Sequence, residues 1–106
     1  MLLNMDGSKQ IDYYMKFPNL WQMTFYHNGI LRPIIMHTPF KHLLVHSEKD
    51  QPFEVDQLPG AALMALKTTF NQIGGLDEKF TFLFEDVDWC YRVKQSAGKL
   101  MVVPQE

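Results

Sequence analysis

The chain has 106 residues, which fits one domain of ordinary size. Its hydrophobic share of 46% and charged share of 21% are typical of a soluble globular protein. The formal net charge of −2, with lysines and arginines scattered along the sequence, argues against a nucleic-acid binder, which normally carries a clustered basic patch.

Cysteine content and hydropathy indicate the compartment. The one cysteine, Cys90, cannot form an internal disulfide, and the chain has no cysteine cluster that could bind zinc, so a reducing compartment is favoured. The N-terminal segment MLLNMDGSKQ lacks the basic and apolar regions of a signal peptide. No window approaches the roughly 20 apolar residues of a membrane span. We therefore expect a cytoplasmic protein, with association at the inner face of a membrane as an option.

The first half of the chain predicts one strand and one longer helix. Residues Gln10–Lys16 are β-permissive and predict a short strand. Phe17–Pro18 then opens a helix, since proline is favoured at the first helical position, and Asn28–Gly29 supplies a C-terminal stop. From Arg32 to Pro52 prolines interrupt the pattern, so we expect a loop with one short helix at about Pro39–His46.

Three aromatic residues repeat at helical spacing in the expected first helix: Phe17, Trp21 and Phe25. Such a stripe can lie on a membrane surface or pack into a core. Lysine and arginine are nearly absent from this segment, whereas helices that lie on membranes are rich in them. The pattern therefore favours core packing.

The second half predicts alternating strands and helices. Phe53–Leu58 alternates like a strand, and the apolar run Ala61–Leu66 suits a buried strand. Thr69 and Gln72 have the spacing of a capping box, and Gly74–Gly75 supplies a helix stop. Asp77 can cap a further turn. This alternation predicts an α/β fold with a mixed sheet and flanking helices.

The most regular helix is expected at about Glu85–Ala97, ended by Gly98 and followed by a strand at Leu100–Val103. On a helical wheel, Cys90, Val93 and Ala97 form an apolar stripe with Asp86 at its head. The opposite face is polar and carries Glu85, Asp88, Arg92 and Gln95. The i,i+4 spacing of Asp88 and Arg92 is that of an ordinary surface ion pair.

Asp86 has two interpretations. In the first, its carboxylate only satisfies backbone N–H groups at the start of the helix. In the second, it is a general base that faces a cleft and takes a proton from an attacking hydroxyl. The helix dipole favours the ionised carboxylate in either case, so helical periodicity leaves both interpretations open.

Several motifs occur in a characteristic order. They are Gly60-Ala61, the run FNQIGGLDEKF from Phe70 to Phe80, Glu85-Asp86-Val87-Asp88-x-Cys90-x-Arg92, Gly98 and Val103-Pro104. This series resembles family 2 glycosyltransferases, most closely the rhamnosyltransferase-like group that builds bacterial surface polysaccharides. Near the N-terminus, Asp6-Gly7-Ser8-x-Gln10 and Phe17-Pro18 resemble the segment that follows the metal-binding motif of that group.

The resemblance implies a GT-A fold and a single displacement, in which an acceptor hydroxyl attacks the anomeric carbon of a nucleotide-sugar and inverts it. It implies that Asp86 is the catalytic base, with Glu85 shaping the same pocket. Gly60 and Ala61 would let the backbone approach donor or acceptor closely. A simple bend is the alternative role for Gly60. The implied partners are a nucleotide-sugar and a glycan or lipid-linked acceptor, with no nucleic acid.

The chain also departs from the family pattern. The nucleotide-binding first half is absent, and with it the Asp-x-Asp that holds Mg²⁺ or Mn²⁺; the Asp86-Val87-Asp88 stretch belongs to a helix. We therefore expect residues 1–106 to be the C-terminal, acceptor-side part of the domain, with little or no activity alone, because the leaving diphosphate needs the metal. A metal site within the chain is not expected.

Two competing interpretations concern other residues. His42 and His46 have the i,i+4 spacing of metal ligands, but packing beside Phe40 and Leu43 is favoured because no third ligand follows. Cys90, on the apolar stripe, is expected to be a small core residue and not a nucleophile. The alternative function is a non-catalytic interaction or oligomerisation module, because a half domain exposes apolar surface that favours self-association.

Overall fold

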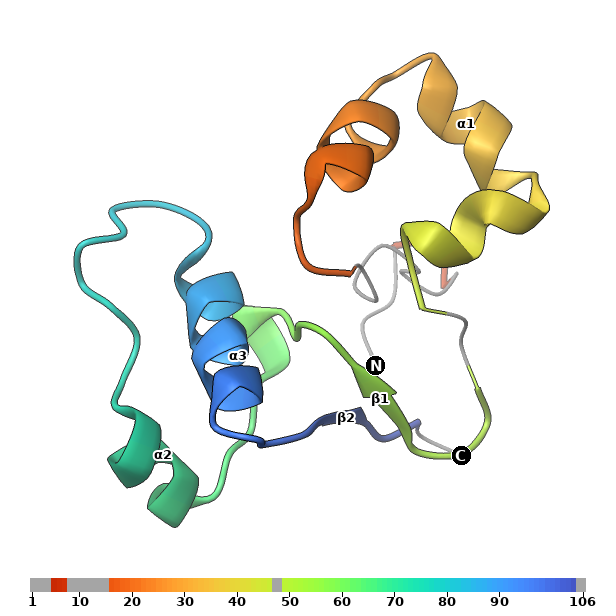
Figure 1. Cartoon of the computed structure of the whole chain (residues 1–106). Coiled ribbons are helices and arrows are strands. Elements are labelled where there is room, and N and C mark those ends of the chain that lie inside the picture. Colours follow the sequence, from red (N-terminus) through yellow and green to blue (C-terminus); the bar gives the residue numbers. More distant parts are fainter. Residues whose placement is uncertain (1–4, 8–15, 47–48, 105–106) are drawn as a thin grey trace.

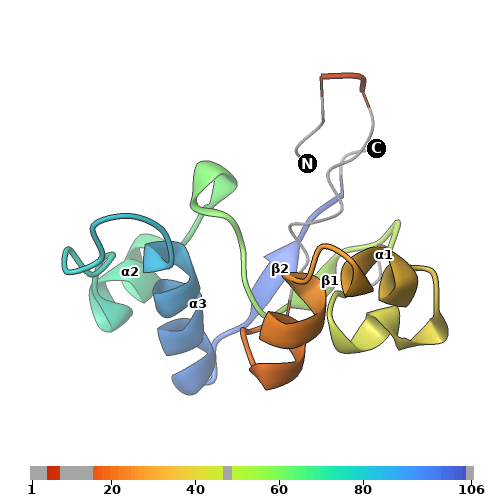
Figure 2. The same ribbon diagram turned by 90° about the horizontal axis from the view of Figure 1, so that it is seen from above.

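The structure, a computed structural model, describes residues 5–7, 16–46 and 49–104. A two-stranded sheet lies between two groups of helices (Figure 1). The helical segments of residues 20–43 lie on one side of the sheet. On the other side lie α2 (Lys67–Ile73) and α3 (Glu85–Gln95). The view from above shows the same arrangement (Figure 2).

The sheet pairs two strands that are far apart in the sequence. β1 (Phe53–Val55) runs antiparallel to β2 (Leu100–Val102), with Phe53 opposite Val102 and Val55 opposite Leu100. Phe53 and Val55 are buried and Glu54 between them is exposed, which is the two-residue alternation of a half-covered strand. Both strands were predicted, although each is shorter than its predicted range.

The main hydrophobic core lies between this sheet and α3. Its buried members come from the two strands and from one face of the helix: Phe53, Val55, Trp89, Cys90, Val93 and Leu100. Cys90 is fully buried, and burial raises the pKa of its thiol. The prediction that Cys90 is a small core residue is therefore confirmed.

α3 ends close to its predicted stop. Ala97 adopts the left-handed φ of 61°, and the Gly98 N–H donates to the Val93 carbonyl at 2.9 Å. A Cβ atom at Gly98 would lie 2.6 Å from Val93 Cγ1, so only glycine fits without a shift. The turn feeds the chain directly into β2.

The first helix starts later than predicted and is less buried. Residues 20–26 are helical, with a π-helical turn at Gln22–Tyr26, and Asn19 Oδ1 accepts the Gln22 N–H at 2.9 Å. Core packing was the wrong prediction for Trp21, which is 64% exposed and stacks on Phe25. Phe25 packs against a second, smaller buried cluster of Leu44 and Val45.

One helix was missed. The prolines suggested a loop after Arg32, but α1 spans Leu31–Met36. Pro33 lies in its first turn, where a backbone N–H has no intrahelical partner to lose. Asn28 Oδ1 accepts the Ile30 and Leu31 N–H groups at 3.0 Å each, so the residue expected to end one helix also caps the next. The short helix predicted nearby is a 3₁₀ helix at Pro39–Leu43.

The buried strand predicted at Ala61–Leu66 was wrong. A 3₁₀ turn spans Gly60–Ala62, and Met64 and Leu66 are 95% and 74% exposed. The described part of the sheet has only β1 and β2, so the apolar run has no neighbouring strand to pair with there. The capping box at Thr69 was also wrong, because α2 begins two residues earlier and no side chain caps it.

Polar contacts centred on Asp56 and Gln57 hold the segment that leads into the first helical group, which comprises the helical segments of residues 20–43. Asp56 Oδ2 accepts the Phe17 N–H at 3.3 Å, and Gln57 Nε2 donates to the Lys16 carbonyl at 2.9 Å. On the same side, Lys94 Nζ lies 2.6 Å from Glu54 Oε1. This hydrogen bond and the Lys94 charge hold the pKa of the Glu54 carboxyl below its usual value.

The described part of the chain thus combines helices with one antiparallel pair of strands. The GT-A architecture stays a prediction, and the strand expected at Gln10–Lys16 lies, apart from Lys16, outside the described residues. Within the described ranges no helix is both long and apolar enough to cross a membrane.

Candidate functional site

The start of α3 is reached through an unusual backbone. Leu83 and Phe84 have φ values of 65° and 68°, which side-chain-bearing residues rarely adopt. This left-handed pair turns the chain sharply, so that the helix begins at Glu85. Residues other than glycine that adopt a left-handed backbone conformation are strained. They occur mainly at functional sites, where the surrounding fold maintains the strain. No sequence signal marked them, because neither is glycine, asparagine or aspartate.

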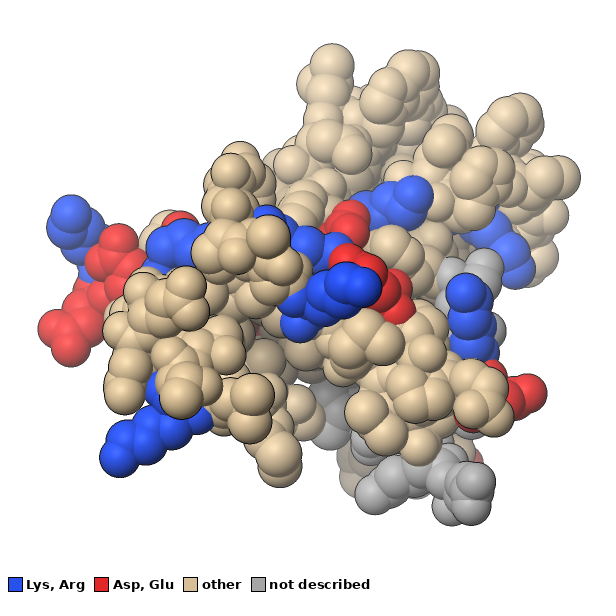
Figure 3. Space-filling model, turned by 60° about the horizontal axis from the view of Figure 1, so that its bottom comes forward, with Lys and Arg blue, Asp and Glu red and all other residues tan. Residues whose placement is uncertain are grey.

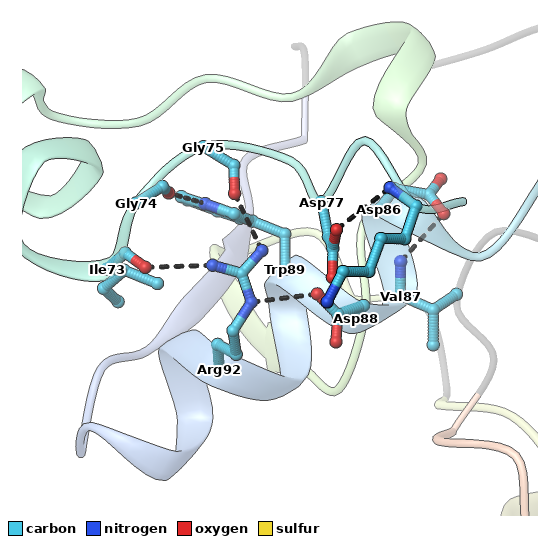
Figure 4. Close-up of polar contacts among 10 residues, drawn as sticks. Ile73, Gly74, Gly75, Asp77, Asp86, Val87, Asp88, Trp89 and Arg92 are labelled. Atoms are coloured by element: carbon cyan, nitrogen blue, oxygen red, sulfur yellow. Dashed lines mark hydrogen bonds and ion pairs between the residues drawn. The ribbon is translucent and has the colours of Figure 1, made fainter. Parts of the chain in front are cut away.

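Asp86 contacts the other segment that was predicted to belong to the site. Its Oδ2 accepts the Gly60 N–H at 2.8 Å, across 26 residues of sequence. Its Oδ1 accepts the N–H of Val87 at 2.8 Å, as Figure 4 shows. Ala61 follows in the same 3₁₀ turn and is exposed. The structure therefore brings Gly60 and Asp86 together.

These contacts bear on the two interpretations of Asp86. The carboxylate does satisfy two backbone N–H groups, as the structural interpretation requires. An ionised carboxylate has about four acceptor sites on its two oxygens, so capacity for a substrate hydroxyl remains. The catalytic interpretation needs that capacity and a cleft beside it.

Asp86 lines a cleft of about 200 Å³. The other lining residues are mostly apolar and come from the chain around Gly60 and from the start of α3: Gln57, Leu58, Pro59, Leu83, Phe84 and Val87. An apolar wall around a carboxylate lowers the local dielectric and strengthens its interaction with a bound hydroxyl. The position is suitable for a general base.

Glu85 faces a different cleft, of about 300 Å³, formed with the loop of residues 76–83. Its Oε2 atom is buried and has no hydrogen-bond partner among the described residues. Leu83 lines both clefts. The prediction that Glu85 shapes the same pocket as Asp86 therefore needs a correction: the two carboxylates line neighbouring clefts, because successive helix residues project in directions about 100° apart.

A second set of contacts fixes the turn after α2 against α3. Arg92 Nε lies 2.9 Å from Asp88 Oδ2, as predicted for an i,i+4 pair. Its two other nitrogens donate to the carbonyls of Ile73 and Gly75, at 2.9 and 2.8 Å (Figure 4). The Trp89 indole N–H donates to the Gly74 carbonyl at 2.8 Å. Gly74, with φ of 87°, ends α2 as predicted.

Sequence reasoning missed this role of Arg92 and Trp89. The available signal was the indole N–H, because a buried tryptophan usually needs a hydrogen-bond acceptor. Trp89 is 2% exposed. Both side chains extend from α3 to the double glycine and hold this turn against the helix by hydrogen bonds.

The acidic residues do not fit a metal site. Both Asp86 oxygens accept backbone N–H groups, and Asp88 pairs with Arg92. Within the described ranges, no group of three or more His, Cys, Asp or Glu side chains is placed to hold a metal ion. Of the two histidines weighed as ligands, His42 Nδ1 contacts the Pro39 carbonyl and His46 Nε2 lies 3.4 Å from Asp56 Oδ1.

Comparison with known proteins gives one partial similarity. The chain is 35% identical over 52 residues to a low-salt glycan biosynthesis hexosyltransferase of Haloferax volcanii. The match covers 46% of this chain and 17% of the hexosyltransferase, so the chain spans only a small part of that protein. No protein-family model and no solved structure matches the chain.

Proposed function

We propose that this chain is the acceptor-side part of an inverting glycosyltransferase, similar to family 2 and built on a GT-A fold. The partial similarity to a hexosyltransferase of glycan biosynthesis supports sugar transfer as the class of chemistry. The ordered motifs around Gly60, Gly74 and Asp86 support the family 2 assignment. The reaction would transfer a sugar from a nucleotide-sugar to a glycan or lipid-linked acceptor, in the synthesis of a bacterial surface polysaccharide.

In this mechanism Asp86 is the general base. Its carboxylate takes the proton of the acceptor hydroxyl as that oxygen bonds to the anomeric carbon of the donor. The bond from the anomeric carbon to the diphosphate oxygen breaks on the opposite face, and the nucleoside diphosphate leaves with the bonding electrons. The anomeric centre is thereby inverted. The contact between Asp86 and the Gly60 N–H holds the carboxylate at the rim of its cleft.

That contact is the observation that carries the proposal. It joins two motifs, chosen from the sequence as parts of one site, at 2.8 Å beside a cleft. It also fixes the carboxylate in one orientation, which a base needs in order to meet a bound hydroxyl with little reorganisation.

A metal ion has no place in this part of the mechanism. The full enzyme is expected to hold Mg²⁺ or Mn²⁺ at an Asp-x-Asp outside this chain, where the ion would neutralise charge on the leaving diphosphate. The residues of this chain would bind the acceptor and remove its proton. We propose a cytoplasmic location for the protein, with association at the inner face of the membrane as an option.

The test is Asp86→Asn in the natural gene product. Purified protein is incubated with UDP-, GDP- and dTDP-linked hexoses and a lipid extract of the source cells, and release of nucleoside diphosphate is measured. Asparagine keeps the size of the side chain but cannot accept the proton, so we expect the rate to fall by roughly 10²- to 10⁴-fold. Asp50→Asn, which removes an exposed carboxylate elsewhere, should keep the rate. Retained turnover in Asp86→Asn would exclude the assignment.

A non-catalytic interaction or oligomerisation module is the second candidate. Exposed apolar side chains favour it, among them Leu20 at 82%, Ile30 at 77%, Met64 at 95% and Phe82 at 82% exposure. The space-filling view shows wide areas of one face without charged side chains (Figure 3). The same assay separates the candidates, because an interaction module would release no nucleoside diphosphate from any donor.

A further inference from the structure

The cleft beside Asp86 has an apolar wall that a ligand can reach. Its volume of about 200 Å³ is below the usual range for small-molecule pockets and leaves room for a single sugar ring. Leu83 and Phe84 line it and are 57% and 49% exposed, so their side chains are open to contact. Among the described residues that line the cleft, Asp86 is the only charged one. Three further apolar residues complete the wall: Leu58, Pro59 and Val87.

The backbone donors along one side of this cleft are already in use. The Leu58 N–H donates to Cys90 Sγ at 3.3 Å, and the Gly60 N–H donates to Asp86 Oδ2 at 2.8 Å. Pro59, between them, has no N–H group. The backbone from Leu58 to Gly60 therefore offers no hydrogen-bond donor to a ligand oxygen.

The rest of the lining adds little polar capacity apart from the Asp86 carboxylate. Gln57 is 7% exposed, and its Nε2 donates to the Lys16 carbonyl at 2.9 Å. The Val87 N–H donates to Asp86 Oδ1 at 2.8 Å. A ligand hydroxyl that enters the cleft away from Asp86 would lose its hydrogen bonds with water and find few replacements, which is costly.

We propose that this cleft selects an acceptor with an apolar face beside the attacking hydroxyl, such as a deoxy sugar, over a fully hydroxylated hexose. The inference rests on the proposed function, since it gives the chemical class of the acceptor that meets Asp86. The attacking hydroxyl donates to the carboxylate, while C–H and methyl groups of the ring pack on Leu83 and Phe84. An added hydroxyl at the apolar wall weakens binding by no more than about 100-fold, because an apolar pocket rejects an extra hydroxyl only moderately.

Matched pairs of glycosides test the selectivity of the 106-residue protein without any need for turnover. The 6-deoxy derivatives of methyl galactoside and methyl mannoside are each compared with the parent hexoside of the same configuration. Cyclohexanol serves as an alcohol of ring size with a single hydroxyl. Carbon–proton correlation NMR follows the methyl signals of Leu58 and Val87, which line the cleft. We expect the 6-deoxy glycosides to bind about tenfold more tightly than their parents, and cyclohexanol to shift the same signals.

One substitution tests whether the apolar wall causes the preference. Leu83→Asn adds a polar side chain to the wall, and asparagine tolerates the left-handed backbone that Leu83 adopts, with φ of 65°. The preference for the 6-deoxy glycosides should shrink by about threefold or more, because the added hydroxyl gains a partner. Leu20→Asn makes the same exchange at a position that is 82% exposed and outside the cleft, and should leave the preference unchanged. Circular dichroism checks that each variant is folded.

The outcomes separate this inference from the proposed function. Equal affinities within each pair, tighter binding of the parent hexosides, no shift of the Leu58 and Val87 signals with any compound, or an unchanged preference in Leu83→Asn would each overturn it. Selective binding together with full turnover in Asp86→Asn would exclude the proposed base and leave the selective cleft standing. Loss of turnover in that variant without any selectivity would keep the base and exclude the selectivity.

Discussion

Arg92 has a larger part in the structure than its spacing from Asp88 suggests. Its guanidinium donates to one carboxylate and two backbone carbonyls, and these acceptors come from α3, from the last residue of α2 and from the turn after it. Five donors in a planar fork can meet three acceptors in different directions. The turn that Arg92 holds leads into the loop that forms the Glu85 cleft.

Replacement of Arg92 by lysine tests this role. Lysine keeps the charge and can keep the pair with Asp88, but one ammonium group cannot reach all three acceptors. We expect Arg92→Lys to lower the free energy of unfolding by about 1–3 kcal/mol, measured by urea denaturation. Lys67→Arg, which exchanges the same two residue types at an exposed site, is the control. Its change in the free energy of unfolding should be near zero. If both variants unfold at the same urea concentration as the parent protein, the contacts to the carbonyls contribute nothing.

Among the secondary-structure elements, α3 ends at a position that requires glycine, because a side chain there would collide with the core. A Cβ at Gly98 would lie 2.6 Å from Val93 Cγ1 and 2.9 Å from the Val93 carbonyl oxygen. Val93 is 3% exposed and belongs to the main core, so it has little room to move. The close turn is what allows the helix and β2 to cover the same core.

Gly98→Ala should therefore destabilise the protein. Overpacking of this kind costs about 1–3 kcal/mol, and we expect a loss of that size in the free energy of unfolding. Gly29→Ala is the matched control, because a Cβ there would meet nothing within 4 Å. Thermal unfolding followed by circular dichroism compares the two variants. If Gly98→Ala destabilised the protein less than Gly29→Ala does, the steric explanation would be contradicted.

The elements that could be predicted are those whose signals are local. The buried positions of Cys90 and Val93, the stop at Gly74 and the alternation in β1 depend on near neighbours in the sequence. Ala97 was wrongly placed on the apolar stripe, because α3 ends at Gln95 and Ala97 is exposed. The errors concern partners in space. The run Ala61–Leu66 has strand composition but no strand beside it in the described sheet, and Trp21 has helical spacing but no core to enter.

For the candidate site, too, one part could be predicted from the sequence and another part could not. The motif order pointed to Gly60 and Asp86, and the structure brings them into contact. The left-handed pair Leu83–Phe84 could not be predicted, because the surrounding fold and not the residue type imposes that backbone. The separation of Glu85 and Asp86 into two clefts follows from their successive positions on α3.

Considered as a whole, the part of the molecule that the structure describes contains two hydrophobic clusters of unequal size. The larger one unites α3 with both strands. The smaller one has two buried members, Leu44 and Val45, and partly buried neighbours from the first helical group. Asp56 and Gln57 form hydrogen bonds with the backbone of Phe17 and Lys16, which precede the first helical group.

The difference in size between the two clusters affects which region of the native protein unfolds locally. A region with little buried apolar area unfolds locally at a lower free energy than the main core. α1 has no buried residue, whereas α3 has three. We expect backbone amides of α1 to exchange with deuterium at least about tenfold faster than those in the middle of α3, and uniform protection would disprove this. The helix that carries Glu85 and Asp86 would then stay folded while the first helical group opens and closes.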